Sequence, residues 1–330
     1  VIVSSDDKKV ETVQMIESNA LNCVRGSAIR VIGELIKNNA DYYLRFKDCI
    51  SKLIDDVNPI INYAVLWVLC PIYDIEKTWA VEKIMLLFEK NYKMIGFDNS
   101  RWIFFHCYSE YKTTIVDAVN KASKTKDERL LQVSGYSIIE LYMVYDEYND
   151  LLNIYEHAEK VLRRYMLEML ITYFEIDKYK SKAKAVLLRV IDGKNDIDSD
   201  FIWGRLFRNE MLDVKDDSDL IKKILYSNIN KRILVDFAEF ILKQGNLKDY
   251  SDLIIESGYA ILDRNQITTN QLWELEDEIP KLIIDLYDIT SVSGLEKDKN
   301  IACECLNIWD KMYECNIGMA RLLTNQIMKM

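Results

Sequence analysis

Two polar turns, each followed by an apolar run, repeat within the first quarter of the chain. The turn from Asn22 to Gly26 leads into a run that ends at Ile36, and the turn from Asp55 to Pro59 leads into a run that ends at Tyr73. Asn22 and Asn58 are 36 positions apart. A period of this size is typical of proteins that stack pairs of helices, in which each pair buries its apolar face against its neighbours. The repeat predicts a helical array, which favours binding over catalysis.

Apolar residues recur at steps of three and four from Ala28 to Ile36, which predicts a helix with one buried face. Asp41 carries a carboxylate suited to an N-cap, and Pro59 fits the first turn of a helix because it lacks an N–H. The register of that helix turns Ala64 toward the core. The same pattern predicts helices over residues 41–54, 59–73, 76–94, 102–123, 127–145, 147–173, 178–191, 201–212, 218–226, 228–244, 249–263, 269–289 and 296–328. No stretch shows the alternation typical of a strand, so the sequence predicts an all-α fold.

Composition favours an elongated form of that fold. The 330 residues include 49% hydrophobic residues, 10 glycines and 3 prolines, which favours long helices with few interruptions. Because a single compact core rarely extends beyond roughly 250–300 residues, we predict one elongated domain over residues 1–330. It is an α-solenoid of HEAT- or armadillo-like helix pairs, with a soft break near 193–200. The chain begins at Val1 rather than at methionine, and we expect it to be a fragment of a longer protein.

The net charge and the cysteine content indicate which class of partner and which cellular compartment to expect. The net charge is −10, so the surface as a whole repels phosphate backbones and nucleic acid is disfavoured. The seven cysteines are an odd number, and several occupy apolar helix positions, which indicates reduced thiols in a cytoplasmic protein. No secretion signal and no apolar run of about 18 residues is visible, so no membrane association is predicted.

No motif in the sequence indicates catalysis. The sequence contains no phosphate-binding Gly-Lys-Ser or Gly-Lys-Thr. Gly26 lies in a helical pattern, and we interpret it as a position where two helices approach closely. The only histidines, His106 and His157, are about fifty positions apart. Cys303 and Cys305 point to different faces of a helix. We therefore predict a non-enzymatic segment with no catalytic residue, no cofactor and no metal.

Aromatic and basic clusters supply the candidate binding residues. The stretch from Trp102 to Tyr108 is rich in aromatic side chains, which are common at binding hot spots and also fill cores. Short basic clusters at Arg163-Arg164 and Lys178 to Lys184 could form a positive stripe, although ordinary exposed helix faces look the same. The candidate binding residues are Trp102, Phe105, Tyr108, Arg163 and Arg164.

Both ends of the chain resemble a known family. The stretch from Glu17 to Ala28, with its Asn-x-Val-Arg-Gly core, and the unit from Asp56 to Tyr73 resemble the C-terminal HEAT-like repeats of large bacterial NACHT- or STAND-type NTPases. The stretch from Cys305 to Glu314 resembles the closing helix of those proteins, with Asn307 where an acidic residue is usual. Many members of the family are tied to anti-phage defence.

The resemblance implies a sensor or scaffold segment that binds a protein, either a phage protein or upstream domains of its own chain. The Walker motifs of that family lie outside this segment, so no catalytic residue is carried over. Nothing in the sequence identifies a small-molecule ligand. Two alternatives remain. One is a HEAT-like nucleic-acid-binding or DNA glycosylase-type protein, which would need a basic concave face, and the other is an oligomerisation scaffold.

Overall fold

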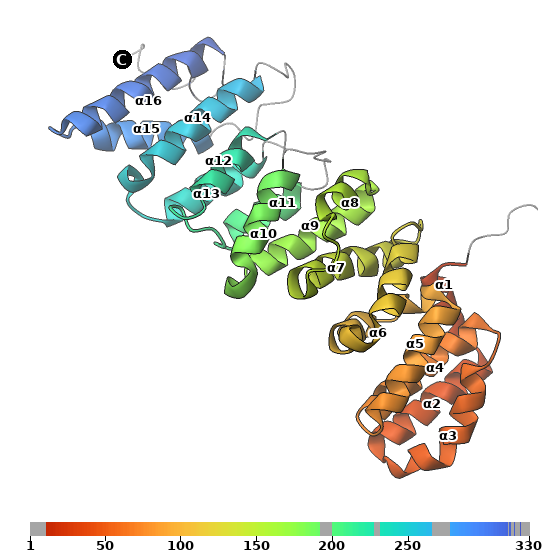
Figure 1. Cartoon of the computed structure of the whole chain (residues 1–330). Coiled ribbons are helices and arrows are strands. Elements are labelled where there is room, and N and C mark those ends of the chain that lie inside the picture. The colour runs from red at the N-terminus through yellow and green to blue at the C-terminus, as the bar shows by residue number, and fades with distance from the viewer. Residues whose placement is uncertain are drawn as a thin grey trace, which may run out of the picture. The chain divides into compact units, whose positions relative to one another are not determined.

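The computed structural model describes residues 11–191, 200–227, 232–265 and 278–315, together with residues 317, 320 and 324. Every regular element within these ranges is a helix (Figure 1). The predicted all-α class is therefore confirmed. Within the same ranges, no helix is both long and apolar enough to cross a lipid bilayer.

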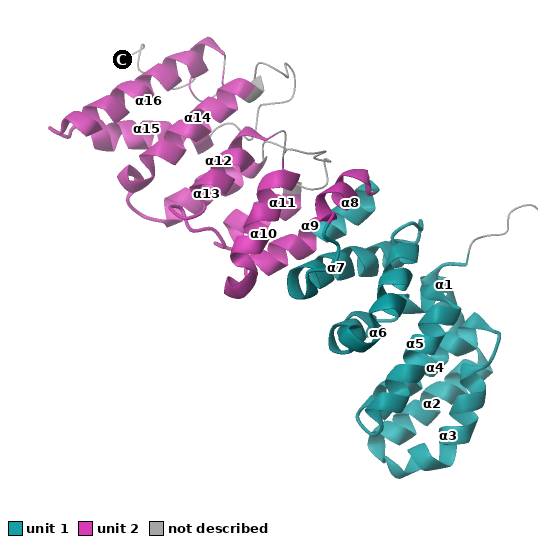
Figure 2. Cartoon of the chain, in the orientation of Figure 1, with its two compact units in different colours: residues 1–149, 159–166 teal, residues 150–158, 167–330 magenta. Residues whose placement is uncertain are grey.

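The chain divides into two compact units (Figure 2). Unit 1 comprises Val1–Asn149 and Glu159–Met166, and unit 2 comprises Asp150–Ala158 and Leu167–Met330. The predicted single domain over residues 1–330 remains a prediction. The soft break predicted near 193–200 falls almost entirely outside the described residues.

Unit 1 contains seven complete α-helices and one 3-10 helix among its described residues. They are α1 (Val13–Asn22), α2 (Val24–Asn38), α3 (Asp41–Ile54), α4 (Pro59–Tyr73), α5 (Lys77–Lys90), η1 (Tyr92–Gly96), α6 (Ser100–Ala122) and α7 (Glu128–Tyr145). The short 3-10 turn replaces the end of the helix predicted over 76–94, because the Asn91 side chain accepts the Lys93 N–H at 3.1 Å and starts a new turn.

Helix α4 is the centre of unit 1, in contact with α1, α2, α3 and α5. Pro59 lies in its first turn as predicted, and Asn58 is the N-cap, whose side chain accepts the Ile60 N–H at 2.9 Å. Ala64 is fully buried, which confirms the predicted register. Because α4 has neighbours on several sides, it is apolar around most of its circumference.

Two predictions about helix starts are wrong. Asp41 does not cap α3, although the helix spans 41–54 as predicted: the N-cap is Ala40, and Asn39 accepts the Asp41 N–H through its side chain. Asn22 is not equivalent to Asn58, because it is the last residue of α1 while the Cys23 thiol caps α2 by accepting the Gly26 N–H. The equivalent N-caps are Cys23 and Asn58, so the period is one residue shorter.

The helix predicted over 147–173 is also interrupted. Asp146 and Tyr148 both adopt left-handed backbone conformations, which end α7 and prevent the helix from continuing. The Glu147 carboxylate, between them in sequence, accepts a hydrogen bond from Tyr108 and forms an ion pair with Lys112, and both partners lie on α6. These tertiary contacts stabilise the interruption after α7, which local helix propensity does not predict. The chain resumes as two helices, α8 (Leu151–His157) and α9 (Lys160–Phe174), and the boundary between the units lies within α9.

Unit 2 continues with further helices. They are α10 (Asp177–Val190), α11 (Asp200–Arg208), α12 (Ser218–Tyr226), α13 (Arg232–Lys243), η3 (Leu247–Tyr250), α14 (Ser251–Asn265), α15 (Glu278–Ser291) and α16 (Glu296–Glu314). The helix predicted over 296–328 is seen as α16, which ends at Glu314, and most of the prediction beyond residue 315 lies outside the described residues. The first part of the helix predicted over 269–289 also lies outside them.

The contacts in unit 2 follow a regular rule: a helix touches the next but one. Helices α8, α10, α12, α14 and α16 contact each other in succession, and so do α11, α13 and α15. Contacts between α12 and α13, α14 and α15, and α15 and α16 join the two series. The apolar faces of helices that are not adjacent in sequence thus cover one another.

Candidate functional site

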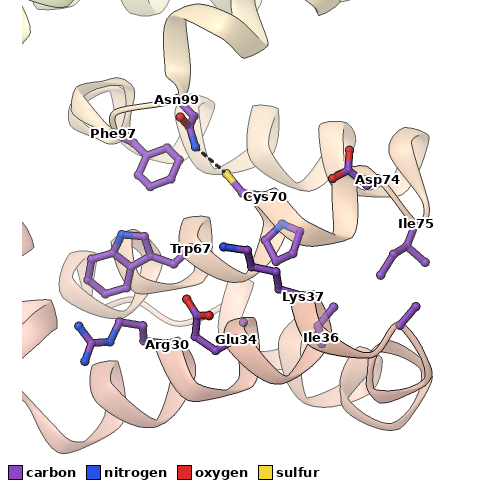
Figure 3. A pocket seen from close by; sticks show the side chains of 13 residues that line it. Arg30, Glu34, Ile36, Lys37, Trp67, Cys70, Asp74, Ile75, Phe97 and Asn99 are labelled. Carbon is purple, nitrogen blue, oxygen red and sulfur yellow. Dashed lines mark hydrogen bonds between the residues drawn. The ribbon is translucent and has the colours of Figure 1, made fainter.

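A groove of about 510 Å³ lies in unit 1, between α2, α4 and the turn that leads into α6 (Figure 3). Arg30 and Glu34 of α2 line one side, and Phe97 and Asn99 lie across from them (Figure 3). Its lining combines aromatic and aliphatic side chains with both signs of charge. We call it the α2/α4 groove, lined by Arg30, Gly33, Glu34, Ile36, Lys37, Ala40, Trp67, Cys70, Pro71, Asp74, Ile75, Phe97 and Asn99.

Pro71 and Gly33 bring the walls of the groove together. Pro71 lies inside α4 and has no N–H, so it cannot donate the helical hydrogen bond to the carbonyl of Trp67. That carbonyl faces Gly33 of α2, where an added β-carbon would lie 3.2 Å from its oxygen. The two helices can approach closely because Gly33 carries no side chain.

A smaller hollow of about 340 Å³ adjoins the groove and shares Cys70, Asp74 and Asn99 with it. Its other lining residues are Tyr73, Ile84, Trp102 and Ile103, and we call it the Trp102 hollow. The Trp102 ring is edge-on to Tyr73, with centroids 4.7 Å apart, and meets His106 at 4.6 Å. The Lys77 ammonium lies 5.4 Å from the centre of the Tyr73 ring.

Cys70 does not offer a reactive nucleophile at the junction of the two cavities. Burial raises the pKa of its thiol, and the Asn99 amide donates a hydrogen bond to its sulfur at 3.5 Å (Figure 3). A thiol kept protonated is a poor nucleophile. In the described part of the chain, no three histidine, cysteine, aspartate or glutamate side chains gather as a metal site would require.

The predicted aromatic candidates divide between the surface and the core. Trp102 is 48% exposed and lines the hollow, and Phe105 is 39% exposed beside Tyr145. Tyr108 is buried, and its hydroxyl donates to Glu147. Of these three residues, Trp102 alone lines the α2/α4 groove or the Trp102 hollow.

The predicted arginines lie elsewhere, on α9. Arg163 is buried, while Arg164 is exposed with its guanidinium 5.6 Å from the centre of the Tyr165 ring. Neither arginine lines the groove or the hollow. The structure therefore does not bring the five candidate residues together into one site.

The basic cluster from Lys178 to Lys184 is partly neutralised by acidic side chains. The buried Asp217 carboxylate pairs with Lys180 at 2.9 Å and with Lys184 at 3.2 Å, and Lys184 also pairs with Asp219 at 2.7 Å. These ion pairs lie within unit 2 and hold α10 against the turn before α12. Two of the lysines that could have formed a phosphate-binding stripe are thus already paired.

Sequence reasoning missed most of the groove. None of the charged or aromatic residues that line the groove is among the predicted binding residues. The available signal was Pro71, because a proline inside a helix marks a local irregularity. No protein-family model, curated protein or solved structure matches the chain.

Proposed function

We propose that this chain is a non-catalytic protein-recognition module, an α-solenoid of HEAT- or armadillo-like helix pairs. The observation that carries the proposal is the α2/α4 groove. The groove has an aromatic lining and charges of both signs at its rim, and the half-exposed Trp102 lies next to it. This composition is typical of a protein-binding hot spot.

The contacts in unit 2 support the repeat architecture. Contacts between alternate helices produce two series of stacked helices, which is how helix-pair repeats bury their faces. Repeats of this kind present long surfaces, and a specific interface needs roughly 1,000 Å² of total buried area.

The charge of the chain also supports a protein partner over a nucleic acid. The net charge is −10, and Lys180 and Lys184 are paired with carboxylates. A phosphate backbone would therefore meet a repulsive surface with few free cations in this cluster. The resemblance to the repeats of bacterial NACHT- or STAND-type NTPases supports the further proposal of a cytoplasmic sensor or scaffold, with a phage protein or a domain of the same parent protein as the partner.

A random 12-residue peptide library displayed on phage tests the proposal. The chain is immobilised and selected against the library, in parallel with Trp67→Ala and Lys37→Glu, which alter the groove floor and its rim. Lys37 is exposed, so the Lys37→Glu variant should fold even if Trp67→Ala disrupts the fold. We expect peptides whose binding to the native chain is lost on Trp67→Ala and altered on Lys37→Glu.

Three other results would overturn the proposal. Enrichment of no peptide, or of peptides that bind both groove variants equally, would leave the groove without a binding role. Salt-dependent retention of duplex DNA at about 150 mM salt would instead favour the nucleic-acid alternative. Self-association of the chain, without peptide capture, would favour the oligomerisation scaffold.

A further inference from the structure

The Trp102 hollow has aromatic surfaces suited to a positively charged group. Trp102 is 48% exposed, and its ring packs edge-on against Tyr73 in the wall of the hollow, with centroids 4.7 Å apart. The face of an indole or phenol ring carries a negative partial charge and attracts cations, with tryptophan the strongest of the aromatic residues. The two rings therefore form a corner that favours a planar cation.

Asp74 adds a negative charge at the same place. It is the C-cap of α4, so its carboxylate stands at the negative end of that helix, where cations are favoured. Within the described residues, Asp74 forms no ion pair, and it lines both the hollow and the groove. A cation in the hollow would therefore meet a carboxylate and two aromatic rings.

One cation already uses part of this surface. Lys77 lies over the Tyr73 ring, which leaves Trp102 as the ring without a cation among the described side chains. The positive charges of Lys77, and of Arg30 and Lys37 in the adjoining groove, repel a second cation. A cation that binds in the hollow must therefore form contacts beyond simple charge attraction. A guanidinium does so, because it can stack on an indole face and donate two hydrogen bonds to one carboxylate.

We propose that the Trp102 hollow binds an arginine side chain of the partner protein, stacked on Trp102 and paired with Asp74. The inference rests on the proposed protein-recognition function and names the chemistry of the partner. The chain's net charge of −10 complements a basic segment and would speed its encounter with the groove.

Peptides from the library selection test this directly. We expect an arginine at a fixed position, and a synthetic peptide with that arginine replaced by glutamine should bind about tenfold more weakly. Asp74→Asn and Trp102→Leu should each weaken the arginine peptide about tenfold and leave the glutamine peptide nearly unchanged. Lys77→Ala should tighten the arginine peptide, because it removes a competing cation.

Asp48→Asn is the matched control, because it removes the same charge from an exposed helix face of unit 1 and should change neither peptide. Peptides that lack arginine but still need Trp67 and Lys37 would overturn this inference and leave the proposed function intact. An arginine peptide that binds Asp74→Asn as well as the native chain would do the same. Absence of any groove-dependent peptide would overturn both.

Discussion

The backbone carbonyl of Ala20, near the end of α1, occupies the space where a β-carbon on Gly26 would lie. Gly26 is in the first turn of α2, just after the Cys23 N-cap. The sequence interpretation of Gly26 as a point of close helix approach is therefore confirmed. The α1–α2 corner depends on a residue without a side chain.

Gly26→Ala should lower the free energy of unfolding by about 2 kcal/mol or more, because the clash is with backbone and not with a movable side chain. Chemical denaturation measures the change. Gly294→Ala is the control, since no atom lies within 4 Å of the added methyl, and it should be nearly neutral. Equal stability of the two variants would contradict the corner described here.

Ala64→Asp should destabilise the chain severely, by about 3 kcal/mol or more, since it places an unpaired charge in the centre of α4. Ala28→Asp, on the exposed side of α2, is the matched control and should have little effect. Thermal unfolding followed by circular dichroism compares the two. An unchanged melting temperature for Ala64→Asp would show that the register of α4 is wrong.

Asp217→Asn should cost about 2–4 kcal/mol, because Lys180 and Lys184 would lose the buried carboxylate that neutralises them. The Asp213 N–H also donates to Asp217 at 2.9 Å, so the turn before α12 should loosen as well. Asp310→Asn, exposed on α16, is the control. If both variants unfold at the same denaturant concentration, the cluster is not a stabilising element.

Because of Tyr259, the free energy of unfolding should depend on pH in the alkaline range. Its hydroxyl donates to the Glu304 carboxylate, and this bond raises the pKa of Tyr259 to about 12, above the ordinary value of 10.0. A raised pKa in the folded state means that the contribution is complete below about pH 10 and is lost as the pH rises toward 12. The difference in unfolding free energy between the native chain and Tyr259→Phe should therefore be constant up to about pH 10 and shrink above it.

The exposed Tyr313 provides the comparison for that experiment, as Tyr313→Phe on α16 removes a hydroxyl for which no carboxylate partner is seen in the described residues. A difference between the native chain and Tyr259→Phe that stays constant from pH 8 to pH 11.5 would contradict the assignment. Absorbance at 295 nm follows ionisation of the tyrosines over the same range.

Helix positions were predictable from sequence where local signals agreed. Asn58-Pro59 and Asp127 have the side chains that caps require, and α4 and α7 begin where these residues place them. Helix α12 matches its predicted range of 218–226 because an apolar stripe and polar turns coincide there. In these helices the capping and burial preferences indicate the same boundaries.

Features held by distant contacts could not be predicted in this way. The break after α7 depends on Glu147 bonding to Tyr108 and Lys112, about forty residues earlier. The α2/α4 groove joins Arg30, Trp67 and Asn99 from three separate elements, and no local pattern relates them. Among the predicted site residues, Trp102 lines the adjoining hollow, whereas Tyr108 points into the core, because the spacing within one helix does not say which neighbour covers each face.

Hydrogen–deuterium exchange of the full chain, with and without a saturating library-selected peptide, tests the recognition role of the groove most directly. We expect slower exchange in residues 30–40, 67–75 and 97–103, which carry most of the lining of the groove and the hollow. Protection confined to unit 2, or no protection in these three segments while the peptide is bound, would contradict it.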